Sequence, residues 1–506
     1  MLPKKLIRNV FTVGGLTAFS RVLGLAREML QSRLIGAGME QSAFVLAFAI
    51  PNMARKLFGE GALTAAFVPI FKGEIERGEI ESAKRLARAV MTTVILSLGA
   101  LVILSTIALS AYLGFSDVVS PRAELTIRLV RILLPYMLFI CGAAFGMGVL
   151  NALGRFTEGA FMPAMLNVVW IVALAVIAFF PSLSLSARVT AVCWAILGGG
   201  AAQMAFLFRC MAKRGYSPLP VFSGLFAGEA RVVWRNTFIA AVGAGAVQIN
   251  YMLDQVLAYL ASDWAAGVIG YAERLMDLPL GVIGVAFGTV LLPTFAGYFA
   301  KGDVAGASEA LRASVEKLMF VMLPAAAGLF VLAPEITAVI YQGNAFDAVA
   351  TVRVSRALAV YALGLAFFGY QKSLVPFFQA QSDMKTPLAV SVKMVGLNAV
   401  LNVLAVCILP VEWRHVGLAS STVICAAIGA VMLTVLAHRK NGPLGLKALT
   451  APIAKCIVFS LAMGWAVAQL KPFFSAFGDL IALALSIASG MAVYGLFALI
   501  FRRRVD

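Results

Sequence analysis

The chain has 506 residues, 61% of them hydrophobic and only 13% charged, with a mean hydropathy of +0.93. Soluble domains are about 45–50% apolar and about 25% charged, so the composition excludes an ordinary soluble protein and predicts an all-α polytopic membrane protein. The formal net charge of +17 does not indicate a nucleic-acid partner, because Lys and Arg cluster in short segments between apolar runs and form no basic stripe interleaved with aromatic residues.

The N-terminal ten residues are basic, but Arg21, Arg27 and Glu28 interrupt what would be the apolar core of a cleavable signal peptide. We therefore expect the first segment to remain in the mature protein. The six cysteines lie in or at the edge of apolar runs, without a CxxC pair or a histidine cluster. This pattern favours buried free thiols over a metal site.

A membrane span needs about 20 mostly apolar residues, and 14 stretches qualify. Two polar ones come first, at about 10–36 and 42–71. Twelve clearer ones follow, at 89–113, 127–150, 163–181, 189–208, 237–262, 278–299, 318–341, 357–378, 386–410, 416–437, 450–470 and 477–501. In the second stretch, Pro51 and the glycines at 59 and 61 predict a broken or kinked helix, which lipid tolerates only where the break faces protein or water.

Alternate connections between these stretches differ in basic content. One side holds Lys4, Lys5, Arg8, Lys72, Arg77, Lys84, Arg85, Arg88, Arg155, Arg209, Lys213, Arg214, Arg231, Arg235, Lys301, Arg312, Lys385, Arg439, Lys440, Lys447 and Arg502 to Arg504. The other side offers mainly Arg122, Arg414 and Lys471, beside several acids. Basic loops stay in the cytoplasm, so we expect both termini to be cytoplasmic.

A faint internal repeat has a period of about 224 residues. Pro69 and Pro293 share that offset, as do Pro163 and Pro387, and an Arg-x-x-Arg pair at 128 recurs at 353. Six spans per unit place both copies in the same orientation. We expect two pseudo-symmetric six-helix lobes around a central cavity, at 1–215 and 216–440, with two further C-terminal helices at 441–506.

Four arginines in or beside predicted spans stand out: Arg21, Arg27, Arg55 and Arg274, the last where the eighth span opens. A charge at the bilayer centre costs about 2.5–3.5 kcal/mol on insertion scales, so we interpret them as lining a wet cavity that receives an anion. A guanidinium grips phosphate through a bidentate fork, which suits a pyrophosphate. Glu28 and Glu60 are the only nearby acids in the first two spans.

The alternative for Arg274 is an internal ion pair, because Glu273 and Asp277 flank it in the sequence. Lys372 also falls within a span and is expected to reach the cavity, whereas the other charged residues near span ends are expected to extend toward the interface.

A second group of polar residues predicts a sodium site: Asp254 in the seventh span, Asn398 and Asn402 in the eleventh, and Thr422 beside Ser420 and Ser421 in the twelfth. Carboxylate, amide and hydroxyl oxygens coordinate small cations. The alternative is hydrogen bonding between helices, which Asn and Ser commonly provide in membranes. No other cofactor is expected.

Little indicates an enzyme. His415 and His438 are expected in loops, and no nucleophile–base arrangement or metal-ligand spacing stands out. A sodium-coupled drug antiporter, an O-antigen-type flippase and a non-transporting scaffold remain as alternatives to an anion-binding transporter. Cationic drugs disfavour a cavity lined by Arg, and a scaffold would not require intramembrane Arg.

Four long motifs carry a family resemblance: FSRVLGLARE at 19–28, IPNMARKLFGEGALTAAFVPIF at 50–71, YAERLMDLPLGVIGVAFGTVLLP at 271–293 and the DMKTP turn at 383–387. With them, essentially the whole chain resembles MurJ (also called MviN), the bacterial lipid II flippase family of the multidrug/oligosaccharidyl-lipid/polysaccharide exporter superfamily.

The resemblance implies a transporter of the inner membrane, active in peptidoglycan and cell-wall biogenesis and so in cell shape. Its cargo would be lipid II, the undecaprenyl-pyrophosphate-linked disaccharide-pentapeptide, with membrane lipids and the cell-wall synthesis machinery as further partners. By motif, Arg21, Arg27, Arg55 and Arg274 match the family's essential cavity arginines and Glu28 and Glu60 its acids. The last two spans resemble its groove for the lipid tail.

Two positions depart from the family's pattern. Ser42 stands where some relatives carry an acid. The sodium site of some relatives matches at Asp254, but its eleventh-span ligands would be Asn398 and Asn402, without a second carboxylate.

Overall fold

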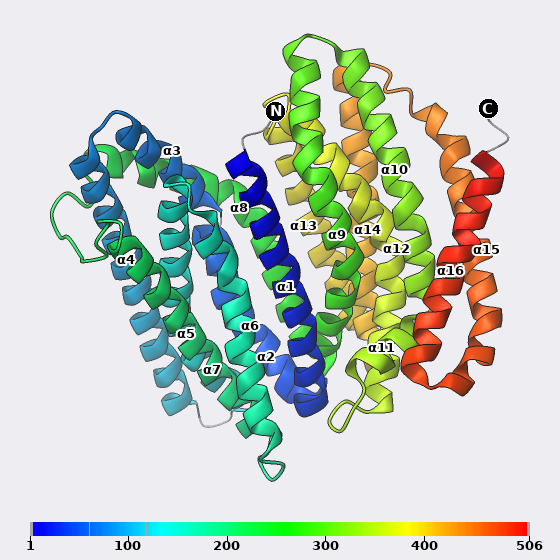
Figure 1. Ribbon diagram of the computed structural model, residues 1–506. Coiled ribbons are helices and arrows are strands. Elements are labelled where there is room, and N and C mark those ends of the chain that lie inside the picture. The colour runs from blue at the N-terminus through cyan, green and yellow to red at the C-terminus, as the bar shows by residue number, and fades with distance from the viewer. Residues whose placement is uncertain (1–3, 60, 117–118, 503–506) are drawn as a thin grey trace. The chain divides into compact units, whose positions relative to one another are not determined.

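The computed structural model describes the backbone of residues 4–59, 61–116 and 119–502 (Figure 1). Side chains are described there except those of residues 4–11, 58–59, 242–244, 246–247, 282–286, 288–289 and 501–502. All regular structure in these ranges is helical, which confirms the predicted all-α class. Glu60, one of the predicted site residues, lies outside the described residues.

The first half of the chain contains α1 (Lys4–Ile35), α2 (Met39–Ala54), the π-helical turn η1 (Arg55–Gly59), α3 (Ala62–Glu76), α4 (Ile80–Phe115), α5 (Pro121–Ala152), α6 (Phe156–Ala178), α7 (Leu185–Ala212) and α8 (Gly228–Ala261). The second half contains α9 (Ala265–Ala300), α10 (Val304–Val331), α11 (Ala333–Tyr341), α12 (Ala348–Gln379), α13 (Lys385–Ile408), α14 (Val411–Asn441), α15 (Thr450–Phe474) and α16 (Asp479–Arg502), with 3₁₀ turns η2 (Leu446–Leu449) and η3 (Ser475–Phe477).

Within the described residues, ten helices are long and apolar enough to cross a membrane: α4 to α7, α10, α12 to α14, α15 with its flanking turns, and α16. The other four predicted spans fall in α1, in α2 to α3, in α8 and in α9. The polytopic character is therefore confirmed, whereas the count of 14 spans stays a prediction.

The predicted break in the second span is confirmed. The stretch divides into α2, η1 and α3, with Pro51 inside α2. A Cβ added to Gly61 would lie 2.5 Å from the Lys56 carbonyl oxygen, so this turn accepts only glycine at that position. Arg55 begins the π-helical turn, and such turns are frequent at functional sites.

The chain divides into two compact units. Unit 1 comprises residues 1–259 and 343–346, and unit 2 comprises residues 260–342 and 347–506. Most of α8 therefore belongs to unit 1. The lobe boundaries expected near residues 215 and 440 stay a prediction.

In unit 1, α5 packs against α2, α4 and α7, and α1 packs against α6. An aromatic cluster of Phe44, Phe48, Tyr136 and Trp170 joins α2, α5 and α6. The tip of the α11–α12 loop also belongs to this unit: Ala345 N donates a hydrogen bond of 3.1 Å to the Arg33 carbonyl near the end of α1.

In unit 2, α12 packs against α9, α10 and α14, and α15 and α16 lie side by side next to α10 (Figure 1). Tyr494 of α16 donates a hydrogen bond of 2.8 Å to the Phe320 carbonyl of α10.

His415, expected in a loop, instead lies in α14, fully buried, with Nε2 3.1 Å from the Arg353 carbonyl oxygen. His438 also lies in α14, in its last turn. The loop prediction was wrong for both residues because the helix extends beyond the apolar stretch at 416–437 at each end.

The six cysteines are free, as predicted. Cys141, Cys193, Cys425 and Cys456 are buried, but Cys407 is exposed on α13. The expectation that all six are buried was therefore too broad.

Candidate functional site

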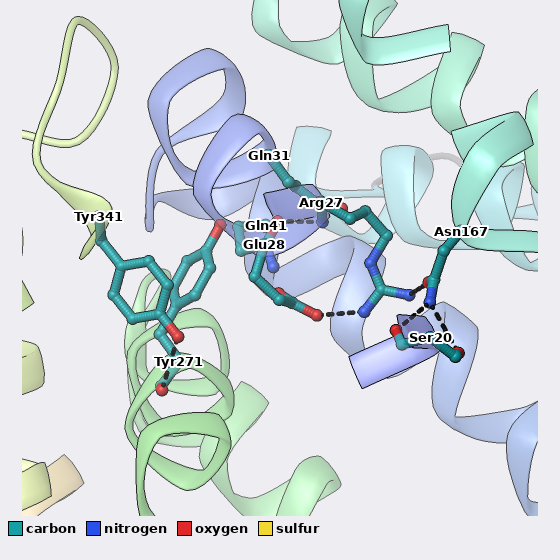
Figure 2. Close-up of polar contacts among 8 residues, drawn as sticks. All are labelled: Ser20, Arg27, Glu28, Gln31, Gln41, Asn167, Tyr271 and Tyr341. Carbon is teal, nitrogen blue, oxygen red and sulfur yellow. Dashed lines mark hydrogen bonds and ion pairs between the residues drawn. The ribbon is translucent and has the colours of Figure 1, made fainter. Parts of the chain in front are cut away.

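Arg27 is the centre of a polar cluster in unit 1 (Figure 2). Its Nη1 donates a hydrogen bond of 2.9 Å to Asn167 Oδ1 of α6, and its Nη2 pairs with Glu28 Oε1. The guanidinium carbon lies 4.3 Å from the ring centre of Trp170. Only 13% of the Arg27 side chain and 13% of the Glu28 side chain are exposed. The structure thus brings two predicted site residues together and fixes the guanidinium on three sides.

Asn167 also holds α1 against α6. Its Nδ2 donates to the Ser20 carbonyl at 3.0 Å and to Ser20 Oγ at 3.4 Å. A Cβ added to Gly24 would lie 3.7 Å from the same amide nitrogen, an ordinary van der Waals distance, so α1 and α6 are in close contact here. Sequence analysis missed Asn167. The sequence feature that could have revealed it is a lone amide in an apolar stretch, because polar groups in such stretches usually form hydrogen bonds between helices.

Gln31 and Gln41 form a second polar link between α1 and α2, with Gln31 Nε2 donating to Gln41 Oε1 at 3.0 Å (Figure 2). Both residues are buried. The segment of α1 that carries Arg27 and Glu28 is therefore tied to its neighbours at each end.

The other two predicted site arginines of unit 1, Arg21 and Arg55, differ in setting. Arg21 is exposed on α1. Arg55 is half-buried and donates from Nε and Nη2 to Asn52 Oδ1, one turn earlier, at 3.3 and 3.0 Å. Beside it, the Lys56 ammonium lies 4.8 Å from the ring centre of Tyr251 in α8. Lys56 and Tyr251 were not predicted.

The remaining charged candidates belong to unit 2. Arg274 and Asp277 are exposed on α9, Glu273 is half-buried, and Lys372 is exposed on α12. Tyr361 donates its hydroxyl to Glu273 Oε1 at 3.4 Å. Tyr341 donates to the Tyr271 carbonyl at 3.3 Å in the same unit (Figure 2). Because the four arginines divide between the two units, a cavity shared by all four stays a prediction.

The residues of the predicted sodium site make hydrogen bonds within their own helices. Asp254 accepts from Asn250 Nδ2 at 3.1 Å in α8. In unit 2, Asn402 Nδ2 donates to Asn398 Oδ1, both residues being buried, and Thr422 donates to the Leu418 carbonyl at 3.2 Å. Oxygens of these kinds suit Na⁺. Since Asp254 lies in unit 1 and the others lie in unit 2, their assembly into one site stays a prediction.

The described residues contain no cluster of three or more His, Cys, Asp or Glu side chains arranged to hold a metal ion.

A family model described as "Lipid II flippase MurJ" matches residues 31–489. The chain belongs to the lipid II flippase MurJ family. It is 33% identical over 503 residues to a probable lipid II flippase MurJ of Rhizobium tropici, a match that covers 97% of this chain and 93% of that one. It is also 33% identical to the lipid II flippase MurJ of Burkholderia cenocepacia, covering 86% and 84% of the two chains.

Solved structures agree on the fold. A lipid II flippase MurJ in an inward closed conformation matches with a TM-score of 0.81 at 24% identity, over 97% of this chain and 99% of that one. An inward-facing multidrug transporter of the MATE family matches with a TM-score of 0.71 at 14% identity, over 86% of this chain and 99% of that one. The resemblance to the MurJ family found in the sequence is confirmed, and the MATE transporter has a similar fold.

Proposed function

We propose that this protein is a lipid II flippase, which moves the undecaprenyl-pyrophosphate-linked peptidoglycan precursor from the inner to the outer leaflet of the cytoplasmic membrane. The observation that carries the proposal is the family match over residues 31–489, together with relatives that bear this name over nearly their whole length. The cargo is moved without chemical change, so no catalytic residue is assigned.

The pyrophosphate is the part of the cargo that the arginines suit. In this proposal Arg21, Arg27, Arg55 and Arg274 receive it in a water-filled cavity, with Lys372 contributing further positive charge. Glu28 positions Arg27 by an ion pair, and Glu60, Glu273 and Asp277 complete the polar lining. The polyprenyl tail stays in lipid, beside the C-terminal helices α15 and α16.

Burial of Arg27 supports a selective role for this residue. Its Nη1 and Nη2 are already engaged by Asn167 and Glu28, so a phosphate must either displace Glu28 or join a network that is already oriented. Among the three predicted site arginines of unit 1, Arg21 is exposed on the same helix and is the one that an incoming anion meets first. Recognition therefore proceeds from the exposed guanidinium to the buried one.

Transport occurs by alternating access, as the two halves of the chain rock about the bound head group. Both termini face the cytoplasm, following the distribution of basic residues in the loops. A sodium ion at Asp254, Asn398, Asn402 and Thr422 couples its inward return to the outward step. The cell-wall synthesis machinery takes up the product at the outer leaflet.

The decisive experiment is depletion of the protein in living cells, followed by a leaflet assay for the lipid-linked precursor. Flippase activity predicts that the precursor accumulates in the inner leaflet and that re-expression restores outer-leaflet exposure. Re-expression of Arg274→Ala, at equal protein level, should not restore it. A drug antiporter or a scaffold would leave the precursor's leaflet distribution unchanged after depletion, and that result would overturn the proposal.

A further inference from the structure

Glu74 is a buried acid that the proposed transport function does not use. It lies in the last turn of α3, after the second predicted span, and only 1% of its surface is exposed. Its Oε1 accepts a hydrogen bond of 3.0 Å from Ser82 Oγ. Its Oε2 is buried and has no hydrogen-bond partner among the described residues. An ionised carboxylate is costly to bury unless both oxygens are satisfied, so this site disfavours the charged form.

Two of the three charges around Glu74, those of Glu79 and Glu229, also disfavour its ionised form. The titratable groups that face it are Arg77 and Glu79 from the α3–α4 turn and Glu229 from the start of α8. Arg77 is the only cation of the three, and its Nε lies 3.4 Å from Glu79 Oε1, in an exposed pair. Glu74 also sits at the C-terminal end of α3, where the helix dipole is negative.

Burial, followed by the charges of Glu229 and Glu79, raises the pKa of Glu74 above its ordinary value. The hydrogen bond from Ser82 and the charge of Arg77 act against this rise but do not cancel it. Glu74 therefore binds a proton more tightly than an exposed glutamate does.

The protonation state of Glu74 affects the α3–α4 turn, because the residue lies within it. Glu79 N donates to the Glu74 carbonyl at 2.9 Å and Gly78 N to the Ile75 carbonyl at 3.0 Å, which closes a tight turn with Gly78 at φ +79°. Ser82 lies in the first turn of α4, so the Glu74–Ser82 hydrogen bond joins α3 and α4 across this turn. A charge on Glu74 would put an unsatisfied anion inside the hairpin.

We propose that Glu74 is a proton-binding site that switches the α3–α4 hairpin between a closed form, in which its carboxyl is neutral, and a loosened form, in which it is ionised and reaches water. The ligand is the proton itself, and the controlled element is the hairpin at residues 73–83. The switch goes beyond the proposed transport function, because it concerns the local opening of a single hairpin and would operate whatever the cargo.

Hydrogen exchange of the amides at residues 73–83, measured on the purified full-length protein at a series of pH values, tests the proposal. After correction for the intrinsic exchange rate, protection should fall as pH rises from the ordinary glutamate pKa to the raised one, by up to about tenfold per pH unit, because the open form releases the proton. In Glu74→Gln, the protection of these amides should stay at its low-pH level at every pH. Glu76→Gln, an exposed acid of the same helix end, should behave as the wild type does.

Two further variants keep the proposal testable if Glu74→Gln folds poorly. Ser82→Ala removes a donor that favours the carboxylate, so the midpoint of the transition should move to higher pH. Glu229→Gln removes a like charge, so the midpoint should move to lower pH. Shifts in these opposite directions would support the switch. Protection that does not depend on pH in the wild type, or midpoints that fail to move apart in the two variants, would overturn it.

Discussion

Arg27 of α1 and Asn167 of α6 are joined by a hydrogen bond of 2.9 Å, although 140 residues separate them in the chain. The same amide group also bonds to the Ser20 carbonyl. The guanidinium direction is therefore set by a neighbouring helix as well as by α1. A positioned arginine recognises phosphate better than a mobile one, because less freedom is lost on binding.

Replacement of Asn167 by Leu tests this arrangement. It keeps the branched shape of the side chain and removes its three hydrogen bonds, so we expect a loss of about 1–3 kcal/mol in stability and a lower rate of precursor translocation. Thermal unfolding and the leaflet assay measure the two effects. Val168→Ala, at the exposed neighbouring position, is the control. Wild-type translocation by Asn167→Leu would show that Arg27 needs no external positioning.

The variant Arg27→Lys tests whether the positive charge at position 27 suffices for function or whether the planar guanidinium is also needed. A lysine keeps the positive charge but cannot hold Asn167 and Glu28 through one planar fork, so we expect complementation of a depletion strain to be partial. Arg27→Ala should abolish it while expression persists. Arg128→Ala, which alters an exposed arginine paired with Glu124, should complement fully. Equal growth with Lys and with Arg at position 27 would mean that charge alone suffices.

Gly36 and Gly78 form a matched pair of glycines in the left-handed region, at φ +80° and φ +79°. A Cβ at Gly36 would lie 2.2 Å from the Ala345 carbonyl oxygen, whereas a Cβ at Gly78 meets open space. Gly78→Ala should cost only about 1–2 kcal/mol from backbone strain. Gly36→Ala should cost clearly more, because the loop tip must also move. Thermal unfolding of the two variants side by side provides the comparison, and equal losses would contradict the close approach.

Asp383 links the α12–α13 turn to α14. A hydrogen bond from Lys440 at 2.6 Å, with another from the Thr386 backbone N–H, lowers the pKa of Asp383 to about 2. A lowered folded-state pKa gives stability that is complete above the ordinary aspartate pKa and is lost as pH falls toward 2. Lys440→Met should remove most of this contribution, about 0.2–1 kcal/mol for a partly exposed pair. Unfolding measured at neutral pH and near pH 3 should show a larger loss at neutral pH, and equal losses would refute the assignment.

The membrane potential should drive the proposed transport. Each elementary charge that crosses 100 mV gains about 2.3 kcal/mol, so an anion of two charges moving outward gains about 4.6 kcal/mol. Collapse of an inside-negative potential in proteoliposomes should therefore slow precursor flux, and Asp254→Asn should reduce any dependence on sodium. Flux that is unchanged by the collapse would remove charge movement from the mechanism.

Local chemistry made part of the site predictable. The break between α2 and α3 followed from Pro51, Gly59 and Gly61, whose backbone preferences act within a few residues. The intramembrane arginines stood out because charge is rare in apolar segments. Two partners of Arg27, Asn167 and Trp170, did not stand out, because they come from a helix far along the chain and no spacing rule links them to Arg27.

The sequence by itself determined the membrane class, the helical architecture and the family, because composition, apolar run length and long motifs are properties of the chain in one dimension. Only the tertiary structure decided that Arg27 is held by Asn167, that His415 is buried and that residues 343–346 join the first unit. It also decided that one Glu74 oxygen is buried with no hydrogen-bond partner in the described part of the chain. Burial and pairing depend on which distant segments pack together, and that packing decides whether a polar side chain meets water, a partner or neither.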